Sequence, residues 1–279
     1  MRTLFLVVLY GLRPGESATL DSLLAQPPAS LPADSALLVW NNGPRPLEDA
    51  ERQRLLAAPG WAEVLIREDV GNPPLSRVYN LALRQGAERL VIFDQDTVVD
   101  GRYLQALGQE AELLVPLVLG AGAIRYPHQY KAVVTTEGPL DPQATVTISS
   151  GLCLTQDLAA RIAARHGDVF DERFALYGVD VSFFLRVQAL AREESVELLC
   201  AGILDHSLSE LEAETPAQRR FRDIEKFYVA LLLRLHYKGA SRGKVLRYLG
   251  RQLLGNRLYL YGVLPRMLRT ILSGRHPRA

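Results

Sequence analysis

The feature that most constrains the fold of this chain is the alternation, over its first two hundred residues, of short apolar runs with amphipathic stretches. Short apolar runs predict buried strands, and amphipathic stretches between them predict helices that cover a parallel sheet. In the first hundred residues we expect strands over residues 3–10, 36–41, 62–67 and 89–93, each closed by Gly, Asn or Asp. The sequence therefore predicts an α/β fold with a mostly parallel sheet, whose ligand crevice lies beyond the carboxyl ends of the strands.

The clearest helix follows the third predicted strand and completes a β-α-β-α-β-α-β order. We expect Asn72 at its N-cap, Pro73 at its first helical position, and its end at Gly86. Its apolar residues recur with helical spacing, which predicts one buried face. That face consists of Leu75, Val78, Tyr79, Ala82 and Leu83.

Beyond residue 97 the pattern is mixed. We expect, in order, a helix around 103–107, a strand over 112–119, an irregular Gly- and Pro-rich stretch, a strand over 145–149, a helix over 178–192 and a strand over 196–201. After Pro216 only helical periodicity remains, with one apolar stripe in a helix over 218–235 and another around 260–271. The sequence therefore predicts an α/β domain over residues 1–212 and a basic helical extension over 213–279.

The charge is distributed unevenly along the 279 residues. From Leu211 onward there are 15 Lys and Arg against 4 Asp and Glu, whereas the first 210 residues hold 17 against 27. In the stretch 244–275 the basic residues alternate with apolar ones, as they do in helices that lie on a membrane surface. We therefore expect peripheral contact with a membrane or a lipid diphosphate and no nucleic-acid partner, with a helical homodimer interface as the alternative.

The remaining sequence signals concern the compartment. Cys153 and Cys200 lie in apolar surroundings without metal-ligand spacing, which favours buried thiols in a reducing compartment. The opening apolar run lacks a small-residue cleavage site after it, so we interpret it as a strand and not as a signal peptide. No apolar stretch approaches the roughly 20 residues that cross a bilayer. We expect a cytoplasmic protein.

A pair of carboxylates follows the fourth predicted strand. Asp94-Gln95-Asp96 ends an apolar run, and alternation along an extended chain sends both Asp side chains to the same side. A hard divalent cation prefers such oxygen ligands while keeping sites for phosphate oxygens. The alternative is an acidic, solvated turn at a strand end.

Several motifs, in order, resemble family 2 glycosyltransferases of the GT-A fold, and most closely their rhamnosyltransferase-like branch. The likeness spans about residues 3 to 230. Its first half lies in Val8-Leu9-Tyr10, Val39-Trp40-Asn41-Asn42-Gly43, Gly71-Asn72 with Asn80, and Phe93-Asp94-Gln95-Asp96. Its second half lies in Ser149-Ser150-Gly151, which resembles the acceptor-side strand end, Phe170-Asp171-Glu172, Val179-Asp180 with Arg186, and Asp205-His206-Ser207-Leu208.

The resemblance implies an inverting, metal-dependent glycosyltransferase in cell-surface polysaccharide synthesis. It implies Asp96 as the main ligand of Mg²⁺ or Mn²⁺, with Asp94 on the ribose or the cation and His206 completing the metal sphere. Asp180 is implied as the catalytic base. The implied donor is a dTDP- or UDP-linked sugar, dTDP-rhamnose first, and the implied acceptor is a glycan or a lipid-linked molecule. Nucleotide-sugar contacts are implied for Tyr10, Asn41, Asn72, Asn80 and Asp94, and acceptor contacts for Ser150 and Gly151.

Some residues admit other interpretations. Asn41 stands where family members usually have Asp, and Asn contributes no charge. Arg77, on the polar side of its helix, is a further candidate for holding diphosphate. His206 can be a surface residue after a strand, and Asp180 a helix cap. The Gln-x-x-Arg-Trp signature of processive relatives is missing, which favours the addition of one sugar per acceptor.

Two rival functions use the same scaffold. A sugar nucleotidyltransferase would carry a Gly-rich basic loop after the first strand, and Gly11-Leu12-Arg13-Pro14-Gly15 is a faint likeness of one. A non-catalytic nucleotide-sugar-binding module is the second rival, and Asn41 is the residue that suggests it.

Overall fold

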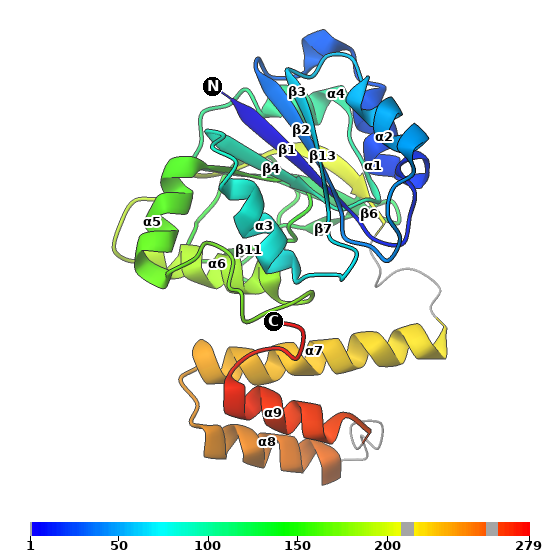
Figure 1. The fold of residues 1–279 in the computed structure, drawn as a ribbon. Helices are drawn as coiled ribbons and strands as arrows, with labels where there is room; N and C mark the ends of the chain where they lie inside the picture. Colours follow the sequence, from blue (N-terminus) through cyan, green and yellow to red (C-terminus); the bar gives the residue numbers. More distant parts are fainter. Residues whose placement is uncertain (1, 208–214, 255–261) are drawn as a thin grey trace.

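The computed structural model describes residues 2–207, 215–254 and 262–279. A sheet flanked by helices forms the larger part, and three helices near the C-terminus pack beneath it (Figure 1). The predicted boundary at residues 212 and 213 lies outside these ranges, as do Leu208 of the late His motif and residues 255–261 of the basic stretch 244–275.

The first half of the sheet is parallel, as predicted. Strands β1 (Thr3–Leu9), β2 (Ser35–Asn41), β3 (Glu63–Glu68) and β4 (Arg89–Phe93) lie in the order β3-β2-β1-β4. Helices α1 (Ala18–Leu24), α2 (Asp49–Leu56) and α3 (Leu75–Leu83) connect them. Leu9 lies opposite Asn41 and Val7 opposite Phe93, so the carboxyl ends of three strands meet at one edge.

The second half of the sheet departs from the expected parallel pattern. Strand β12 (Leu152–Thr155), which the sequence did not indicate, lies antiparallel between β4 and β6 (Leu113–Gly120). Strand β13 (Leu198–His206) runs parallel to β6 and extends five residues beyond the predicted end at residue 201. The short strands are β5 (Thr97–Val98), β7 (Ala123–Tyr126), β8 (His128–Gln129), β9 (Ala132–Val133), β10 (Gly138–Pro139) and β11 (Thr145–Val146).

One expected strand is much shorter than predicted. The strand expected over 145–149 is reduced to Thr145–Val146 and pairs with β8 in a separate three-stranded sheet. Residues 149–151 form a turn that leads into β12. Ser150 and Gly151 therefore precede a strand, whereas the resemblance placed them at the end of one.

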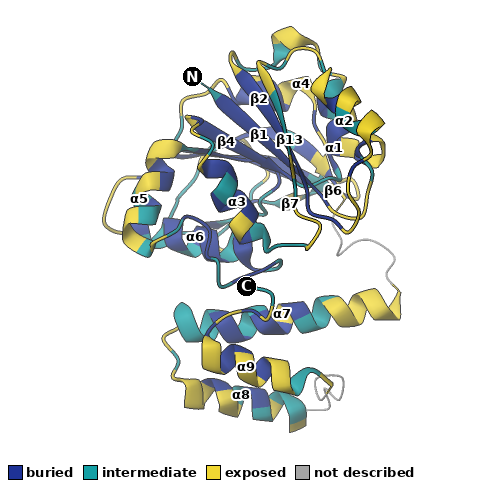
Figure 2. Cartoon of the chain, in the orientation of Figure 1, coloured by how far each residue is buried: buried dark blue, intermediate teal, exposed yellow. Residues whose placement is uncertain are grey.

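Apolar side chains fill both faces of the main sheet. Along β1, Leu4, Leu6 and Val8 pack toward α3, α5 (Gln156–His166) and α6 (Val179–Leu190). The alternate residues of β1 pack toward α1, α2 and α4 (Gly101–Ala106). Figure 2 shows strands β1, β2 and β4 as buried between these layers. Cys153 and Cys200 are buried free thiols, as expected.

Helix α3 begins later than predicted. Its N-cap is Pro74 and its first residue is Leu75, whereas Asn72 has a left-handed backbone with φ of 55°. A residue that precedes proline is disfavoured in the helical region, so Pro73 cannot start a helix before Pro74. The predicted N-cap role of Asn72 is therefore wrong, although Val78, Tyr79, Ala82 and Leu83 form the predicted buried face.

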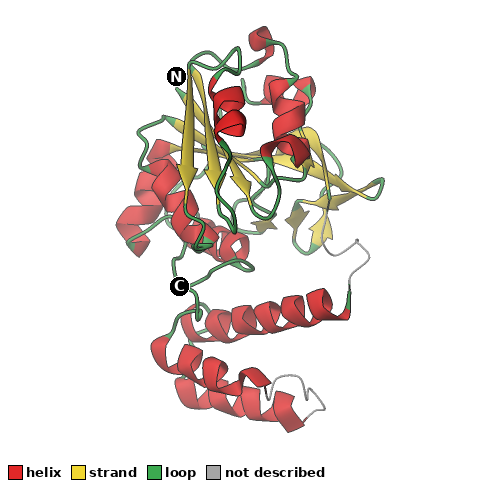
Figure 3. Cartoon of the chain, turned by 45° about the vertical axis from the view of Figure 1, so that its right-hand side comes forward, coloured by secondary structure: helices red, strands yellow, loops and turns green. Residues whose placement is uncertain are grey.

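The C-terminal region consists, in the described residues, of α7 (Pro216–His236), α8 (Arg242–Leu254) and α9 (Leu264–Ser273) (Figure 3). Thr215 and Gln218 form a capping box at the start of α7. Buried residues of all three helices make a small core of their own, while Leu232 of α7 joins the core of the sheet. Within the described ranges no helix has the length and apolarity that a membrane span requires.

Candidate functional site

Asp94, Gln95 and Asp96 leave the end of β4 at the sheet edge where β1 and β2 also end. Gln95 fixes this turn to the end of β1, because its Oε1 accepts a hydrogen bond from the Tyr10 backbone N–H at 2.7 Å. The Ser17 hydroxyl donates to the Gln95 carbonyl at 2.8 Å. With the middle residue held in this way, Asp94 and Asp96 both line one pocket.

Thr97 links the acidic turn to the late histidine. Its fully buried Oγ1 lies 2.8 Å from His206 Nδ1 and 2.6 Å from Ser150 Oγ. His206 is the last residue of β13 and pairs with Thr97 across the β5–β13 ladder. Its Nδ1 is 3.6 Å from Asp96 Oδ1. The structure thus brings Asp94, Asp96 and His206 together, residues that are up to 112 positions apart in the sequence. Thr97 was not identified from the sequence.

The pocket has a volume of about 950 Å³ and is bounded by three groups of residues. One group comes from the strand ends and includes the acidic turn. A second comes from the loop before α6 and its first turn. The third comes from α7, α9 and the C-terminal residues, and the sequence did not indicate it.

Asp180 lies in the first turn of α6 and lines the same pocket as the acidic turn. The N-cap of α6 is Gly178, so Asp180 does not cap the helix; its Oδ1 accepts from the Val181 N–H at 2.8 Å. Burial, with the charge of Asp94 adding to it, raises the pKa of Asp180 to about 6. Burial also raises the pKa of Asp94, against the effect of His206. The charge of Asp94 therefore disfavours ionisation of Asp180.

Five sequence-predicted residues lie outside the pocket lining. Asn41 is buried, and its Nδ2 donates to Glu68 Oε2 at 2.7 Å. Asn80 is buried too, and it holds Phe170 through hydrogen bonds of 2.8 and 2.9 Å. Arg77 is exposed. The other two are Ser150 and Gly151.

Ser150 and Gly151 lie outside the pocket lining but contact residues that shape the site. Ser150 Oγ accepts from the Asp94 N–H at 3.1 Å. Gly151 has φ of +80°, and a Cβ there would lie 2.4 Å from Leu204 and 2.6 Å from Pro116. Only glycine fits this position, because both the backbone conformation and the space exclude a side chain.

Asn42 is a pocket residue that sequence reasoning did not select. Its Nδ2 donates to Asn72 Oδ1 at 2.9 Å, and both side chains line the pocket beside Tyr10. Trp40 Nε1 donates to Asn42 Oδ1 at 3.2 Å, so the amide is oriented from both sides. The sequence could have indicated Asn42 because it follows Asn41 at the end of β2. The pleat of the strand directs the Asn42 side chain into the pocket and the Asn41 side chain toward Glu68.

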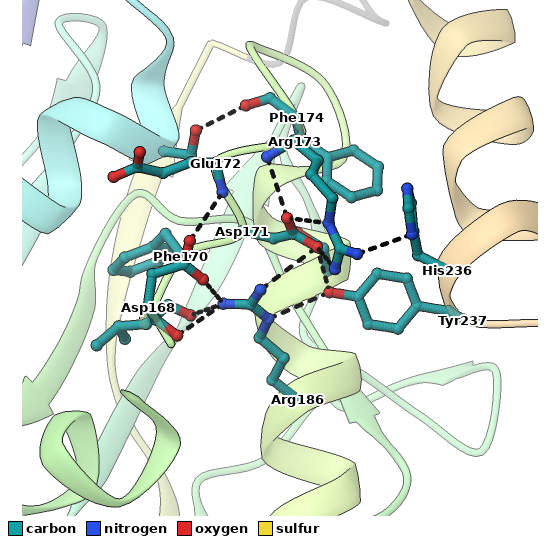
Figure 4. Close-up of polar contacts among 12 residues, drawn as sticks. Asp168, Phe170, Asp171, Glu172, Arg173, Phe174, Arg186, His236 and Tyr237 are labelled. Atoms are coloured by element: carbon teal, nitrogen blue, oxygen red, sulfur yellow. Dashed lines mark hydrogen bonds and ion pairs between the residues drawn. The ribbon is translucent and has the colours of Figure 1, made fainter. Parts of the chain in front are cut away.

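A buried network joins α7 to the segment before α6 (Figure 4). Asp171, which is 1% exposed, accepts from Arg173 Nη2 at 2.6 Å and from the Tyr237 hydroxyl at 2.7 Å. Arg186 Nε donates to Tyr237 Oη at 3.2 Å, and Arg173 Nη1 lies 2.7 Å from His236 Nδ1. Burial would raise the pKa of Asp171, but the Arg173 hydrogen bonds and the Arg186 charge lower it. The network therefore fixes α7 against the pocket.

The donor set at the acidic turn suits a hard cation. Magnesium-type sites use one or two carboxylates and leave the other positions to water and phosphate. Asp94 and Asp96 supply such carboxylates, and His206 stands beside them. In the parts of the chain that the structure describes, no three His, Cys, Asp or Glu side chains gather closely enough to enclose an ion by themselves. Such a site would be completed by the phosphates of a ligand.

The fold is that of GT-A glycosyltransferases, with a curled, mostly parallel sheet flanked by helices. S. aureus TarS 1-349 matches with a TM-score of 0.56 at 13% identity, over 84% of this chain and 64% of that one. A second S. aureus TarS structure matches with a TM-score of 0.57 at 14% identity, over 100% of this chain and 50% of that one. GalNAc-T7, crystallised with UDP, GalNAc and Mn²⁺, matches with a TM-score of 0.56 at 9% identity, over 83% and 50%.

At these identities the likeness establishes the fold alone. The chain spans 64% of the length of TarS 1-349 and half of the other two proteins. TarS 1-349 is also found in complex with UDP and with UDP-GlcNAc. No protein-family model matches the chain, and no curated protein matches it.

Proposed function

We propose that the chain is an inverting, metal-dependent glycosyltransferase that moves one sugar from a nucleoside diphosphate to an acceptor hydroxyl. The observation that carries the proposal is the convergence of Asp94, Asp96 and His206 with Asp180 on one pocket of a GT-A fold. The acidic turn follows β4 and the base belongs to α6, so two different elements supply the groups that act on the two substrates.

In this reaction Asp180 takes the proton of the acceptor hydroxyl as its oxygen attacks the anomeric carbon. The new bond to carbon forms on one face while the bond to the diphosphate oxygen breaks on the other, through an oxocarbenium-like state. A pKa of about 6 suits this role, because the carboxylate is ionised at neutral pH and still accepts a proton readily. Asp96, Asp94 and His206 would hold a divalent cation, which would supply positive charge to offset the charge on the departing diphosphate.

The nucleotide side of the pocket lies at the strand ends. Tyr10, Asn42 and Asn72 line it, and we assign the contacts to the nucleoside there. The fold neighbours that hold UDP or UDP-GlcNAc support a UDP-linked donor. The rhamnosyltransferase-like motifs support dTDP-rhamnose. The chain then acts in the cytoplasm on a glycan or lipid-linked acceptor of cell-surface polysaccharide synthesis.

The test measures release of nucleoside diphosphate from UDP-GlcNAc and from dTDP-rhamnose with Mn²⁺ or Mg²⁺. Asp96→Ala and Asp180→Asn should each lower the rate by about 100-fold or more. Asp205→Asn is the matched control, because Asp205 is exposed next to His206 and lies outside the lining. Retention of activity in both site variants contradicts the assignment. Metal-dependent UDP binding without turnover of any donor would instead indicate a binding module.

A further inference from the structure

The wall of the pocket that faces away from the acidic turn is partly apolar. It is formed by α7, by the start of α9 and by the C-terminal residues, none of which the proposed donor site uses. Phe221 is half exposed there, at 51%. The apolar side chains of this wall are Phe221, Ile224, Val229 and Val263.

The last residues of the chain are fixed against this wall. The His276 N–H donates to the Arg173 carbonyl at 2.9 Å, and the His276 ring packs edge-on against Tyr228 with centroids 4.8 Å apart. His276 Nε2 also lies 3.2 Å from Glu225 Oε1. Arg278, two residues further on, lines the pocket as well.

Two arginines, Arg266 and Arg278, line this wall. Nε and Nη2 of Arg278 are buried without a hydrogen-bond partner, although Nη2 is 3.7 Å from Glu225 Oε2. Arg266, on α9, is exposed and makes no hydrogen bond or ion pair with the described residues. This end of the pocket therefore carries Arg266 and Arg278 beside one buried carboxylate, Glu225, whereas the donor end carries Asp94 and Asp96.

We infer that this wall binds a lipid-linked saccharide as the acceptor: the wall holds its lipid phosphate, and a hydroxyl of its saccharide is the one that Asp180 deprotonates. The guanidinium groups of Arg266 and Arg278 bind the phosphate or diphosphate, and the hydrocarbon chain lies along the apolar side chains of α7. Guanidinium suits this role because its planar N–H groups match two phosphate oxygens at once. The inference rests on the proposed function, since it names the acceptor class for that reaction.

The experiment measures binding of farnesyl phosphate to the full chain by calorimetry, with EDTA present so that no divalent ion attracts phosphate to Asp94 and Asp96. The double variant R266Q/R278Q should bind at least about tenfold more weakly than the unmodified chain. The control R269Q/R275Q removes the same charge from the same segment, at exposed residues outside the lining, and should bind normally. Farnesol and inorganic phosphate should each bind far more weakly than farnesyl phosphate.

Three results would overturn the inference: equal weakening in both double variants, no weakening in either, or equal binding of farnesyl phosphate and inorganic phosphate. The first would show general electrostatic attraction, and the last a plain anion site. UDP binding with Mn²⁺ is measured in the same proteins. If farnesyl phosphate binds no better than inorganic phosphate while UDP still binds, only the assignment of the acceptor wall is rejected. If none of the proteins binds UDP, the assignment of the donor site is rejected.

Discussion

At the scale of single residues, Asp180 combines a proposed catalytic role with a cost to folding. Its pKa in the folded chain is about 6, raised from 3.8 by burial and by Asp94. The folded state therefore disfavours its ionisation: the cost is absent below about pH 4 and complete above about pH 6. With EDTA present, Asp180→Asn should raise the free energy of unfolding by about 1–3 kcal/mol at pH 8 and leave it unchanged at pH 4.

Thermal unfolding at the two pH values checks this prediction. Asp21→Asn, at an exposed carboxylate of α1, is the control and should not show the pH-dependent gain. A stabilisation of Asp180→Asn that is the same at pH 4 and pH 8 would contradict the assigned cause.

Thr97 provides a second test at this scale. Its hydroxyl bridges Ser150 Oγ and His206 Nδ1, so Thr97→Val removes one hydrogen bond from each of these buried groups and should cost about 1–3 kcal/mol. Thr147 is an equally buried threonine whose Oγ1 has no hydrogen-bond partner, so Thr147→Val should be neutral or stabilising. Denaturant titration of both variants decides the matter, and equal effects would show that the bridge contributes nothing.

At the scale of elements, Tyr237 is the residue through which the end of α7 reaches Asp171 and Arg186. Tyr237→Phe removes both contacts while keeping the ring, and it should lower the free energy of unfolding by about 1–3 kcal/mol. Tyr248 on α8 stacks on Phe227 and makes no hydrogen bond with the described residues. Tyr248→Phe should therefore be nearly neutral in the same denaturant titration. Equal stability of the two variants would mean that the network does not hold α7.

The elements show which parts of the fold local sequence determines. Strands β1 to β4 and the buried face of α3 were predictable from the sequence. Buried strands need runs of apolar residues, and a helix with one buried face needs apolar residues at helical spacing. Strand β12 has four residues and lies between two partners that are distant in sequence, so periodicity gives no sign of it. The start of α3 was misjudged because the restriction that Pro74 places on Pro73 overrides the capping preference of Asn72.

The candidate site, like the fold, was predictable from the sequence only in part. Four of the predicted site residues belong to motifs that the sequence shows, and all four line one pocket: Asp94, Asp96, Asp180 and His206. The pocket residue at the end of β2 is Asn42 and not the predicted Asn41, because the side chains of neighbouring residues at a strand end point to opposite sides. The wall from α7 and α9 carries no motif, since it arises only when helices distant in sequence pack together.

At the scale of the whole molecule, the uneven charge predicts salt-dependent membrane contact. Lys244, Arg247 and Arg251 are exposed on α8, and we expect the chain to float with phosphatidylglycerol vesicles at 0.1 M NaCl and to be released at 0.5 M. Replacing all three with Gln should abolish flotation. The matched control removes three exposed arginines from the α/β part, Arg54, Arg67 and Arg84. Salt-insensitive self-association without flotation would favour the dimer interface.

The pocket draws its two ends from stretches of chain that are far apart in sequence, the strand ends before residue 207 and the helices after residue 215. On the proposed assignment, specificity for the activated sugar and specificity for the molecule that receives it are then encoded by separate parts of the gene. Recombination near residue 210 could exchange one preference while preserving the other. Chimeras joined there offer a route to enzymes that decorate new recipients with an unchanged sugar.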